Sequence, residues 1–489
     1  APDKAYGTKN DLKYLIDKCH ENGIAVIMDI VLNQADYENP YVKMYWDGSK
    51  PSADSPMFNQ TDRHPFGVFF DFNHESVATK AYVNRANAFW LQEYKIDGFR
   101  FDLAKGFTQK QTSNDAQFRL YDQSRVDIWK GYYDNIRKVD ASAFVILELF
   151  SEDLEERTFT NMGMMVWGNH NYDFRGMMKG ESVDLTRLSY QSRGMTTPGV
   201  VSYMESHDEE RTMWESLTWG QTSPVNIRQL SNAINRNQLM AAFFFSIPGP
   251  KMMWQFEEFG YDQELNNDRL GIKPTKWEYL DNPERQRLFN MYRAMIDIKS
   301  NNNAFNNPQN ATLELFQPLK SIKLTDADLQ VVLYGNFGLT DIAGANLTFP
   351  ASGTWYNYFT GEEIVLSGNS RAFRVRANEF LMFTNKKLPL PEGEILQDPI
   401  LSINPEISNQ SEFKIYPVPA SDRLIIKVPE TMNSGNFRII DVTGKVIRED
   451  VYLATDKNLQ VDIQEFTSGL YIFEISDNRQ LMRKRFLKK

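Results

Sequence analysis

Amphipathic helices and apolar runs alternate along the first 300 residues of the chain. Residues 24–32 form a nearly continuous apolar run, which is typical of a parallel strand covered on both faces. Thr8 and Asp11 form a capping-box pattern in front of it, which predicts the start of a helix. Two more helices are predicted, each followed by an apolar run, at 79–94 with 96–101 and at 127–139 with 144–149. This alternation predicts an α/β fold.

Three later apolar runs, at 164–167, 200–204 and 251–254, bring the count to six helix-strand steps of a (β/α)8 barrel that should have eight. We therefore expect residues 1–300 to form a partial TIM barrel without its first two strands, and we interpret the chain as N-terminally truncated. Such an open barrel exposes two sheet edges and should be prone to aggregation. The polar, aromatic-rich residues 35–76 are too many for a structureless loop, so they predict a subdomain inserted after barrel strand 3.

The hydrophobic period changes to two after residue 300. Residues 301–387 contain alternating runs such as 329–334 and 354–359, which predict an antiparallel β domain. Prolines punctuate residues 388–412, which we interpret as a linker. Residues 413–489 predict a third domain, so two β-sandwich-like domains are expected to follow the barrel.

Composition excludes several classes of function. The formal charge is -10 with a pI near 5.3, and the first 400 residues carry no basic stripe interleaved with aromatics, so nucleic acid is not an expected partner. Cys19 is the single cysteine, which excludes an intrachain disulfide. No run of about 18 apolar residues is present, so no transmembrane segment is predicted.

Three carboxylates follow three of the predicted strands: Asp102, Glu148 and Asp208. The ends of parallel barrel strands converge on one face, where side chains are typically catalytic. Retaining glycosidases need a carboxylate nucleophile and a carboxylic acid about 5 to 5.5 Å apart. Arg100 should lower the pKa of Asp102, whereas the apolar strand around Glu148 should raise the pKa of that residue. The sequence therefore predicts a sugar-cleaving site.

In their order and surroundings these residues resemble the α-amylase superfamily, glycoside hydrolase family 13. The resemblance rests on GFRFDLAK at 98–105, FVILEL at 144–149 and VSYMESHD at 201–208. It implies that Asp102 is the nucleophile, oriented by Arg100, and that Glu148 is the general acid/base. It also implies that Asp208 and His207 hold sugar hydroxyls and stabilise the transition state.

The same resemblance implies further site residues. Lys105 matches a lysine that contacts the aglycone, and Asp29 matches a structural aspartate. Asn33 matches an asparagine that often helps to hold calcium, so Ca²⁺ is an expected structural cofactor and no organic cofactor is expected. The family's usual histidines are replaced by Gln34, a substrate-contact position, and by Gly106.

The C-terminal residues resemble a type IX secretion sorting domain. The resemblance rests on IYPVPASD at 415–422, SGLY at 468–471 and the basic RKR at 483–485. It implies a secreted or surface-attached protein that meets the type IX machinery through residues 413–489. Motifs such as DFNHES at 71–76 are similar to those of secreted Bacteroidetes amylases.

We predict a retaining hydrolase that cleaves α-1,4-glucosidic bonds in starch-like glucans through a covalent intermediate on Asp102. A transglycosylase or a debranching enzyme is an alternative, because the same carboxylates serve all of them. From a different class, the chain could be a surface glucan-binding protein with an inactive site, which Gln34 and Gly106 make conceivable. An adhesion role rests only on the two β domains.

Overall fold

The computed structural model divides into two compact units, Ala1–Leu396 and Gln397–Lys489. The residues that it describes are 3–265, 269–396, 414–428, 432–441, 445–453, 455–477 and 481–489. Of the predicted linker, residues 397–412 lie outside the described residues. In the described part, none of the helices is long and apolar enough to cross a bilayer.

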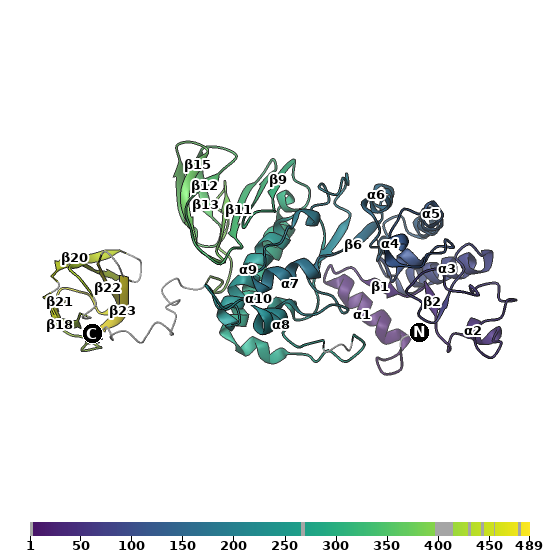
Figure 1. The fold of residues 1–489 in the computed structure, drawn as a ribbon, viewed down its shortest axis with the longest axis horizontal. Helices are drawn as coiled ribbons and strands as arrows, with labels where there is room; N and C mark the ends of the chain where they lie inside the picture. Colours follow the sequence, from purple (N-terminus) through teal and green to yellow (C-terminus); the bar gives the residue numbers. More distant parts are fainter. Residues whose placement is uncertain are drawn as a thin grey trace. The chain divides into compact units, whose positions relative to one another are not determined.

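A six-stranded parallel sheet forms the centre of the first unit, as expected for a partial TIM barrel (Figure 1). Its spatial order follows the chain: β1 (Ile27–Ile30), β4 (Gly98–Phe101), β5 (Phe144–Leu147), β6 (Met165–Asn169), β7 (Val200–Tyr203) and β8 (Lys251–Met252). Helix α1 (Lys9–Glu21) precedes β1, and α10 (Pro283–Asn301) follows β8. The helices between neighbouring strands include α3 (Val77–Phe89), α5 (Gln123–Val139), α6 (Asp153–Met162), α7 (Asn171–Lys179), α8 (Thr212–Trp219) and α9 (Leu230–Ser246).

Local sequence explains these elements. The predicted capping box is present at α1, where the Thr8 side chain accepts from the Asp11 N–H and the Asp11 side chain accepts from the Thr8 N–H. Phe99 and Phe101 of β4 are fully buried in one core with Trp129 of α5, so this face of the strand turns toward the helices. The alternate residue, Arg100, therefore faces the inside of the barrel.

The expectation that the strand at residues 24–32 is covered on both faces is wrong. Ile27 and Asp29 are exposed, and Met28 and Ile30 are only partly buried. The reason is that β1 is an edge strand of the described sheet and pairs only with β4.

Residues 35–76 contain a short two-stranded sheet and a helix. Strand β2 (Gln34–Ala35) pairs with β3 (Phe70–Asp71), and helix α2 (Pro40–Met44) lies between them in sequence. A small core of its own joins the segment, with Val42, Phe58 and Phe72 fully or almost fully buried. The segment thus has the organisation of a small subdomain.

An antiparallel β domain follows α10. One sheet has the order β14 (Glu363–Leu366), β13 (Gly353–Asn357), β16 (Phe380–Thr384), β11 (Gln330–Asn336), β10 (Leu319–Thr325), β9 (Asn310–Glu314). The second sheet pairs β12 (Ile342–Thr348) with β15 (Ser370–Val375). Arg236 of α9 is fully buried and bonds to Asn378 and to the Phe337 carbonyl oxygen, which fastens this domain to the barrel helices.

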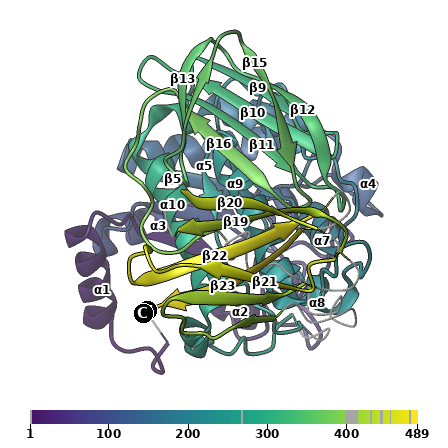
Figure 2. The ribbon, with the colours of Figure 1, turned by 90° about the vertical axis from the view of Figure 1, so that its left-hand side faces the viewer.

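The second unit is built from antiparallel strands in two sheets. One contains β17 (Lys414–Tyr416), β18 (Arg423–Lys427) and β21 (Asn458–Asp462), and the other contains β20 (Val446–Tyr452), β19 (Gly435–Asp441), β22 (Gly469–Ser476) and β23 (Leu481–Lys488), in that order (Figure 2). Their facing side chains, among them Leu424, Ile439 and Phe473, form a separate core.

Candidate active site

One guanidinium group holds two of the predicted catalytic carboxylates. Arg100 Nη1 donates to Asp102 Oδ1 over 2.9 Å, and Arg100 Nη2 lies 3.0 Å from Glu148 Oε2. Asp102 follows directly after β4, and Glu148 follows directly after β5, its paired neighbour. The parallel pairing therefore brings residues that are 46 positions apart to the same end of the sheet.

Three further contacts orient this pair. The Leu103 N–H donates to Glu148 Oε2 over 2.7 Å, and Leu103 reaches that position in the left-handed region at φ 42°. Arg100 Nη1 also donates to Asp29 Oδ1 over 2.7 Å. The Arg100 guanidinium carbon lies 3.9 Å from the centroid of the Trp167 ring on β6, so a cation-π contact fixes the guanidinium plane.

Burial and neighbouring charges set the protonation state of Glu148. Burial raises the pKa of Glu148 to about 7, against the lowering effect of Arg100, and the charges of Asp102 and Asp208 add to the rise. A carboxylic acid with that pKa is partly protonated at neutral pH, which a general acid requires. Asp102 is more exposed than Glu148 and accepts a hydrogen bond from Arg100.

The third carboxylate stands further from its strand than the sequence suggested, because Asp208 follows the end of β7 at Tyr203 by five residues. Its Oδ1 lies 3.4 Å from His207 Nε2, and its Oδ2 lies 2.5 Å from Arg269 Nη2. It is close enough to Glu148 for its charge to raise the Glu148 pKa. The structure therefore brings all three predicted carboxylates to one place.

The sequence did not predict Trp167 and Arg269 as neighbours of these carboxylates. Trp167 ends a predicted strand, so the sequence could place it at the carboxyl end of the sheet. The hydrophobic pattern, however, did not indicate which aromatic ring contacts Arg100. Arg269 lies in the segment after β8, and no periodicity places such a segment above Asp208.

Two other predicted substrate contacts have protein partners. Lys105 is buried, its Nζ lies 3.1 Å from Asp115 Oδ1 and 4.7 Å from the Phe118 ring centroid, and burial lowers its pKa. Gln34 Oε1 accepts from Asn33 Nδ2 over 2.8 Å. Lys105 is thus engaged by the segment that follows β4, and Gln34 by its neighbour Asn33.

The surroundings of Asn33 contain buried oxygens. Among the described residues, Asn33 Oδ1 and Asp71 Oδ1 have no hydrogen-bond partner. His64 Nε2 lies 3.3 Å from Asn33 Nδ2 and 3.5 Å from Asp71 Oδ2. Ca²⁺ takes six to eight oxygen ligands, and no group of three or more His, Cys, Asp or Glu with metal-ligand geometry occurs among the described residues. The side chains alone therefore supply too few ligands for calcium.

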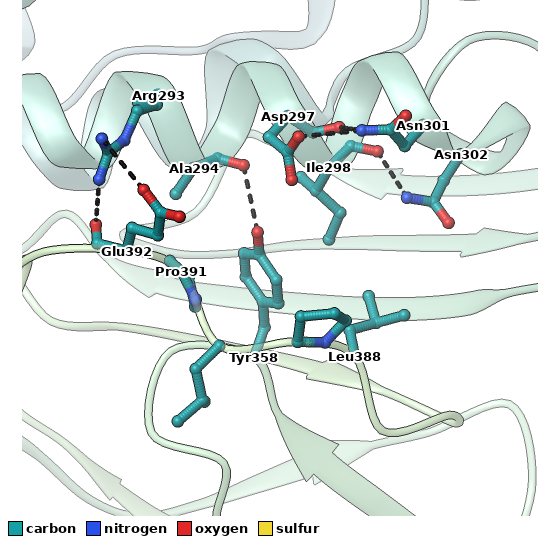
Figure 3. Close-up of a pocket in the computed structure, with 12 residues that line it drawn as sticks. Arg293, Ala294, Asp297, Ile298, Asn301, Asn302, Tyr358, Leu388, Pro391 and Glu392 are labelled. Carbon is teal, nitrogen blue, oxygen red and sulfur yellow. Dashed lines mark hydrogen bonds and ion pairs between the residues drawn. The ribbon is translucent and has the colours of Figure 1, made fainter.

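A separate pocket of about 550 Å³ lies between α10 and residues 388–392 (Figure 3). The Tyr358 hydroxyl donates to the Ala294 carbonyl oxygen over 3.2 Å, and Arg293 Nη2 donates to the Glu392 carbonyl oxygen over 2.7 Å. None of the predicted catalytic residues lines this pocket. The Arg293–Glu392 bond holds residues 388–392 against α10, so the pocket lies where this segment contacts the helix.

Comparison with known families decides the identity of the first unit. Residues 2–67 and 67–308 match the family described as alpha amylase, catalytic domain. The chain belongs to the alpha-amylase family. Residues 414–489 match a second family, described as secretion system C-terminal sorting domain. The sorting domain is of the type IX kind and indicates a secreted or cell-surface protein.

Individual relatives of this alpha-amylase family member are distant. It is 20% identical over 299 residues to alpha-amylase 3 of Dictyoglomus thermophilum, covering 56% of this chain and 54% of that protein. It is 23% identical over 333 residues to the 1,4-alpha-glucan branching enzyme GlgB of Picrophilus torridus, covering 63% of this chain and 44% of that protein. The chain thus spans about half the length of the curated relatives it matches.

Solved structures share its fold. An alpha-amylase from Geobacillus thermoleovorans, complexed with acarbose, superposes with a TM-score of 0.57 at 16% identity, over 78% of this chain and 82% of that one. Eubacterium rectale Amy13B superposes with a TM-score of 0.58 at 17% identity, over 78% of this chain and 83% of that one. The amylase architecture therefore extends beyond the barrel into the following β domain.

Proposed function

We propose that the protein is a retaining glycoside hydrolase that cleaves α-1,4-glucosidic bonds in starch-like glucans. Asp102 attacks the anomeric carbon and forms a covalent glycosyl-enzyme intermediate, while Glu148 protonates the leaving oxygen. Glu148 then takes a proton from a water molecule whose oxygen attacks the anomeric carbon, which breaks the bond to the Asp102 carboxylate and releases the sugar. His207 and Asp208 hold sugar hydroxyls beside the reacting carbon.

One observation carries this proposal: Arg100 contacts both Asp102 and Glu148 within 3.0 Å, while burial raises the pKa of Glu148 to about 7. A carboxylate and a carboxylic acid held close together supply a nucleophile and an acid. A close pair favours retention, since an inverting mechanism needs room for a water molecule between the carboxyl groups.

The test is turnover of amylose and maltotriose by the whole protein. Asp102→Asn and Glu148→Gln should each lose nearly all release of reducing sugar, because each removes one chemical role. Asp127→Asn, an exposed change on α5, is the matched control and should keep full activity. Undiminished release by either active-site variant would sink the proposal.

Transfer to a sugar acceptor is the second candidate, because 1,4-alpha-glucan branching enzymes are among the matched relatives. The same glycosyl-enzyme intermediate serves hydrolysis and transfer, and the attacking hydroxyl decides the product. Chromatography of the products from amylose separates the two: shorter linear chains indicate hydrolysis, and new branch points indicate transfer. A glucan-binding protein without activity would bind amylose and release nothing.

Two associations complete the proposal. Asn33 Oδ1 and Asp71 Oδ1 would contribute two ligands to a structural Ca²⁺ ion, with backbone and water oxygens as the others. Equal melting temperatures in CaCl2 and in EDTA would exclude that role.

The second association is with the type IX secretion machinery of a Bacteroidetes-type bacterium, through residues 414–489. Deletion of those residues should leave the protein inside the cell that makes it.

A further inference from the structure

Two of the proposed sugar contacts, His207 and Asp208, lie on a turn and not on a strand. This turn, residues 204–211, connects β7 to α8. The side chains of His207 and Asp208 are partly exposed, so packing around them does not fix their positions. A loop holds a functional side chain less precisely than a strand or a helix does. Contacts elsewhere in the turn must therefore place these two groups.

Asn171, the first residue of α7, connects the two ends of the 204–211 turn. Its Nδ2 donates to the Met204 carbonyl oxygen and to the Glu210 carbonyl oxygen, each over 2.9 Å. Asn171 is almost fully buried, and its own N–H donates over 3.0 Å to Asn169 Oδ1, at the end of β6. Because β6 pairs with β7, this clamp is fixed to the sheet from which the turn leaves.

Arg211 holds the same turn from its buried side. It is fully buried, and its Nη1 donates over 2.6 Å to the Ser206 carbonyl oxygen. Ser206 Oγ accepts from the N–H of Asp208 over 3.2 Å. The Arg211 guanidinium carbon lies 5.6 Å from the centroid of the Trp254 ring, which lies 6.1 Å from the centroid of the His207 ring. One residue thus separates Arg211 from each of the proposed sugar contacts.

Stability alone does not explain the burial of Arg211. Its Nη1 lies 3.7 Å from Glu205 Oε2, whereas Glu205 Oε1 accepts from the N–H and from the hydroxyl of Thr212, each over 2.7 Å. Among the described residues, Arg211 Nε and Nη2 have no hydrogen-bond partner. Burial of a cation with unused donors is unfavourable. Its place beside the 204–211 turn gives this cation a role in the site.

The position of Asp208 also affects the proposed general acid. The Asp208 charge adds to the effect of burial, which raises the pKa of Glu148 to about 7. The Asp102 charge acts in the same direction, whereas Arg100 and the hydrogen bond from the Leu103 N–H lower this pKa. Coulomb interactions weaken with distance, so movement of Asp208 away from Glu148 lowers the Glu148 pKa. That pKa therefore reports the position of Asp208 even when no sugar is cleaved.

We propose that Asn171 and Arg211 are positioning residues, which hold the 204–211 turn so that His207 and Asp208 face the sugar. The inference rests on the proposed function, in which His207 and Asp208 hold sugar hydroxyls beside the reacting carbon. It adds the residues on which their placement depends. Asn171 begins α7, and Arg211 directly precedes α8, so the turn is held at the starts of two helices.

The first measurement is the turnover of amylose by the whole protein carrying Asn171→Ala. We expect kcat/KM to fall about 10- to 100-fold, mainly through kcat, because small displacements of groups beside the reacting carbon have effects of this size. Asn336→Ala is the matched control. Asn336 is almost fully buried in the β domain, and its Nδ2 also donates to two carbonyl oxygens, those of Thr340 and Val375. The control should keep its kcat/KM.

Arg211→Lys is the second variant, because lysine keeps the charge but lacks the planar guanidinium that reaches Ser206 and lies beside Trp254. We expect a loss of kcat/KM in the same range. Arg236→Lys is its control, since Arg236 on α9 is also fully buried and donates to a backbone carbonyl oxygen. If Arg211→Lys does not fold, Asn171→Ala decides the inference.

The second measurement is the titration midpoint of Glu148, followed by NMR of ¹³C-labelled glutamate carboxyl groups. Asn171→Ala and Arg211→Lys should lower this midpoint, in the same direction as Asp208→Asn. Added to Asp208→Asn, Asn171→Ala should not move the midpoint further, because the charge that it positions is gone. A merely structural role would lower stability and leave the midpoint in place.

The outcomes separate this inference from the proposed function. If Asn171→Ala loses activity but keeps the Glu148 midpoint of Asn336→Ala, its effect is general and the inference is overturned. Equal losses of kcat/KM in Asn171→Ala and Asn336→Ala would overturn it as well. If the natural protein cleaves no glucan, the proposed function fails. The Glu148 midpoint then still decides whether Asn171 positions Asp208.

Discussion

The backbone N–H of Leu103 donates to Oε2 of Glu148 over 2.7 Å. The residue that follows the proposed nucleophile thus holds the proposed acid, and it does so with a left-handed backbone at φ 42°. Main-chain geometry at the end of β4 therefore sets the orientation of the carboxyl group at the end of β5. The left-handed conformation of Phe150, just beyond Glu148, places backbone strain after both of the proposed catalytic carboxylates, where it is held by the surrounding contacts.

Activity should fall as pH rises through about 7, because the general acid must carry a proton and burial raises the pKa of Glu148 to about 7. Asp208→Asn should move this midpoint to lower pH, since the Asp208 charge contributes to the rise. The titration is best followed by NMR of the ¹³C-labelled glutamate carboxyl groups, with Glu148→Gln to assign the signal. A midpoint that stays in place would contradict this electrostatic account.

Loss of the central arginine should destabilise the protein in a pH-dependent way. Arg100→Met leaves Asp29, Asp102 and Glu148 without their shared cation, and removing one partner of a buried ion pair costs about 3–5 kcal/mol. The loss of unfolding free energy should be larger at pH 8 than at pH 5, where Glu148 is protonated. Urea unfolding followed by tryptophan fluorescence measures this loss. Equal losses of unfolding free energy at pH 5 and pH 8 would refute the prediction.

In the presence of EDTA, which removes any bound Ca²⁺, Asp71→Asn should stabilise the protein at neutral pH. Burial raises the pKa of Asp71 from 3.8 to about 6, so the native state binds this proton more tightly than the unfolded state does. The resulting stability is complete below pH 3.8 and is lost as pH rises to about 6. The variant should match the natural protein at pH 4 and exceed its unfolding free energy by about 1–3 kcal/mol at pH 7.

Thermal melting at both pH values checks this prediction for Asp71. Asp54→Asn, an exposed change in the same inserted segment, is the control and should follow the natural protein. A variant that is less stable than the natural protein at pH 7 in EDTA would contradict this prediction.

Lys95→Gly should raise stability. Lys95 is exposed, ends the helical turn Trp90–Tyr94 and adopts φ 58°, a conformation that glycine adopts without strain. The expected gain is about 0.5–1 kcal/mol in unfolding free energy. In contrast, Lys130→Gly inside α5 should lose about 1 kcal/mol. Denaturant titration of both variants measures the difference in unfolding free energy. A loss of unfolding free energy in Lys95→Gly would contradict the left-handed conformation of Lys95.

The sequence predicted the elements that depend on local pattern. Thr8 and Asp11 identified the start of α1, and the mainly apolar runs before Asp102 and Glu148 identified β4 and β5, because strands of a parallel sheet covered on both faces are rich in apolar residues. The order of the three carboxylates followed from those strands. Spacing alone could not place Asp208 beside Glu148, which depends on the loop after β7.

Contacts between distant segments could not be predicted in this way. Trp167 on Arg100 and Arg269 on Asp208 join positions 67 and 61 residues apart, and side-chain packing decides them. The exposure of Ile27 was missed for a related reason: an apolar run indicates what a strand would bury, whereas its coverage depends on which strands lie beside it.

The Trp167 ring lies against the Arg100 guanidinium and packs edge-on against the Tyr203 ring of β7, with the ring centroids 5.2 Å apart. Residues in contact through a shared neighbour do not contribute independently to free energy. Substitutions at Arg100 and at Tyr203 should therefore show a thermodynamic coupling that disappears once Trp167 is replaced. Through this ring, a change in the packing of β7 would alter how firmly the carboxyl groups of Asp102 and Glu148 are held.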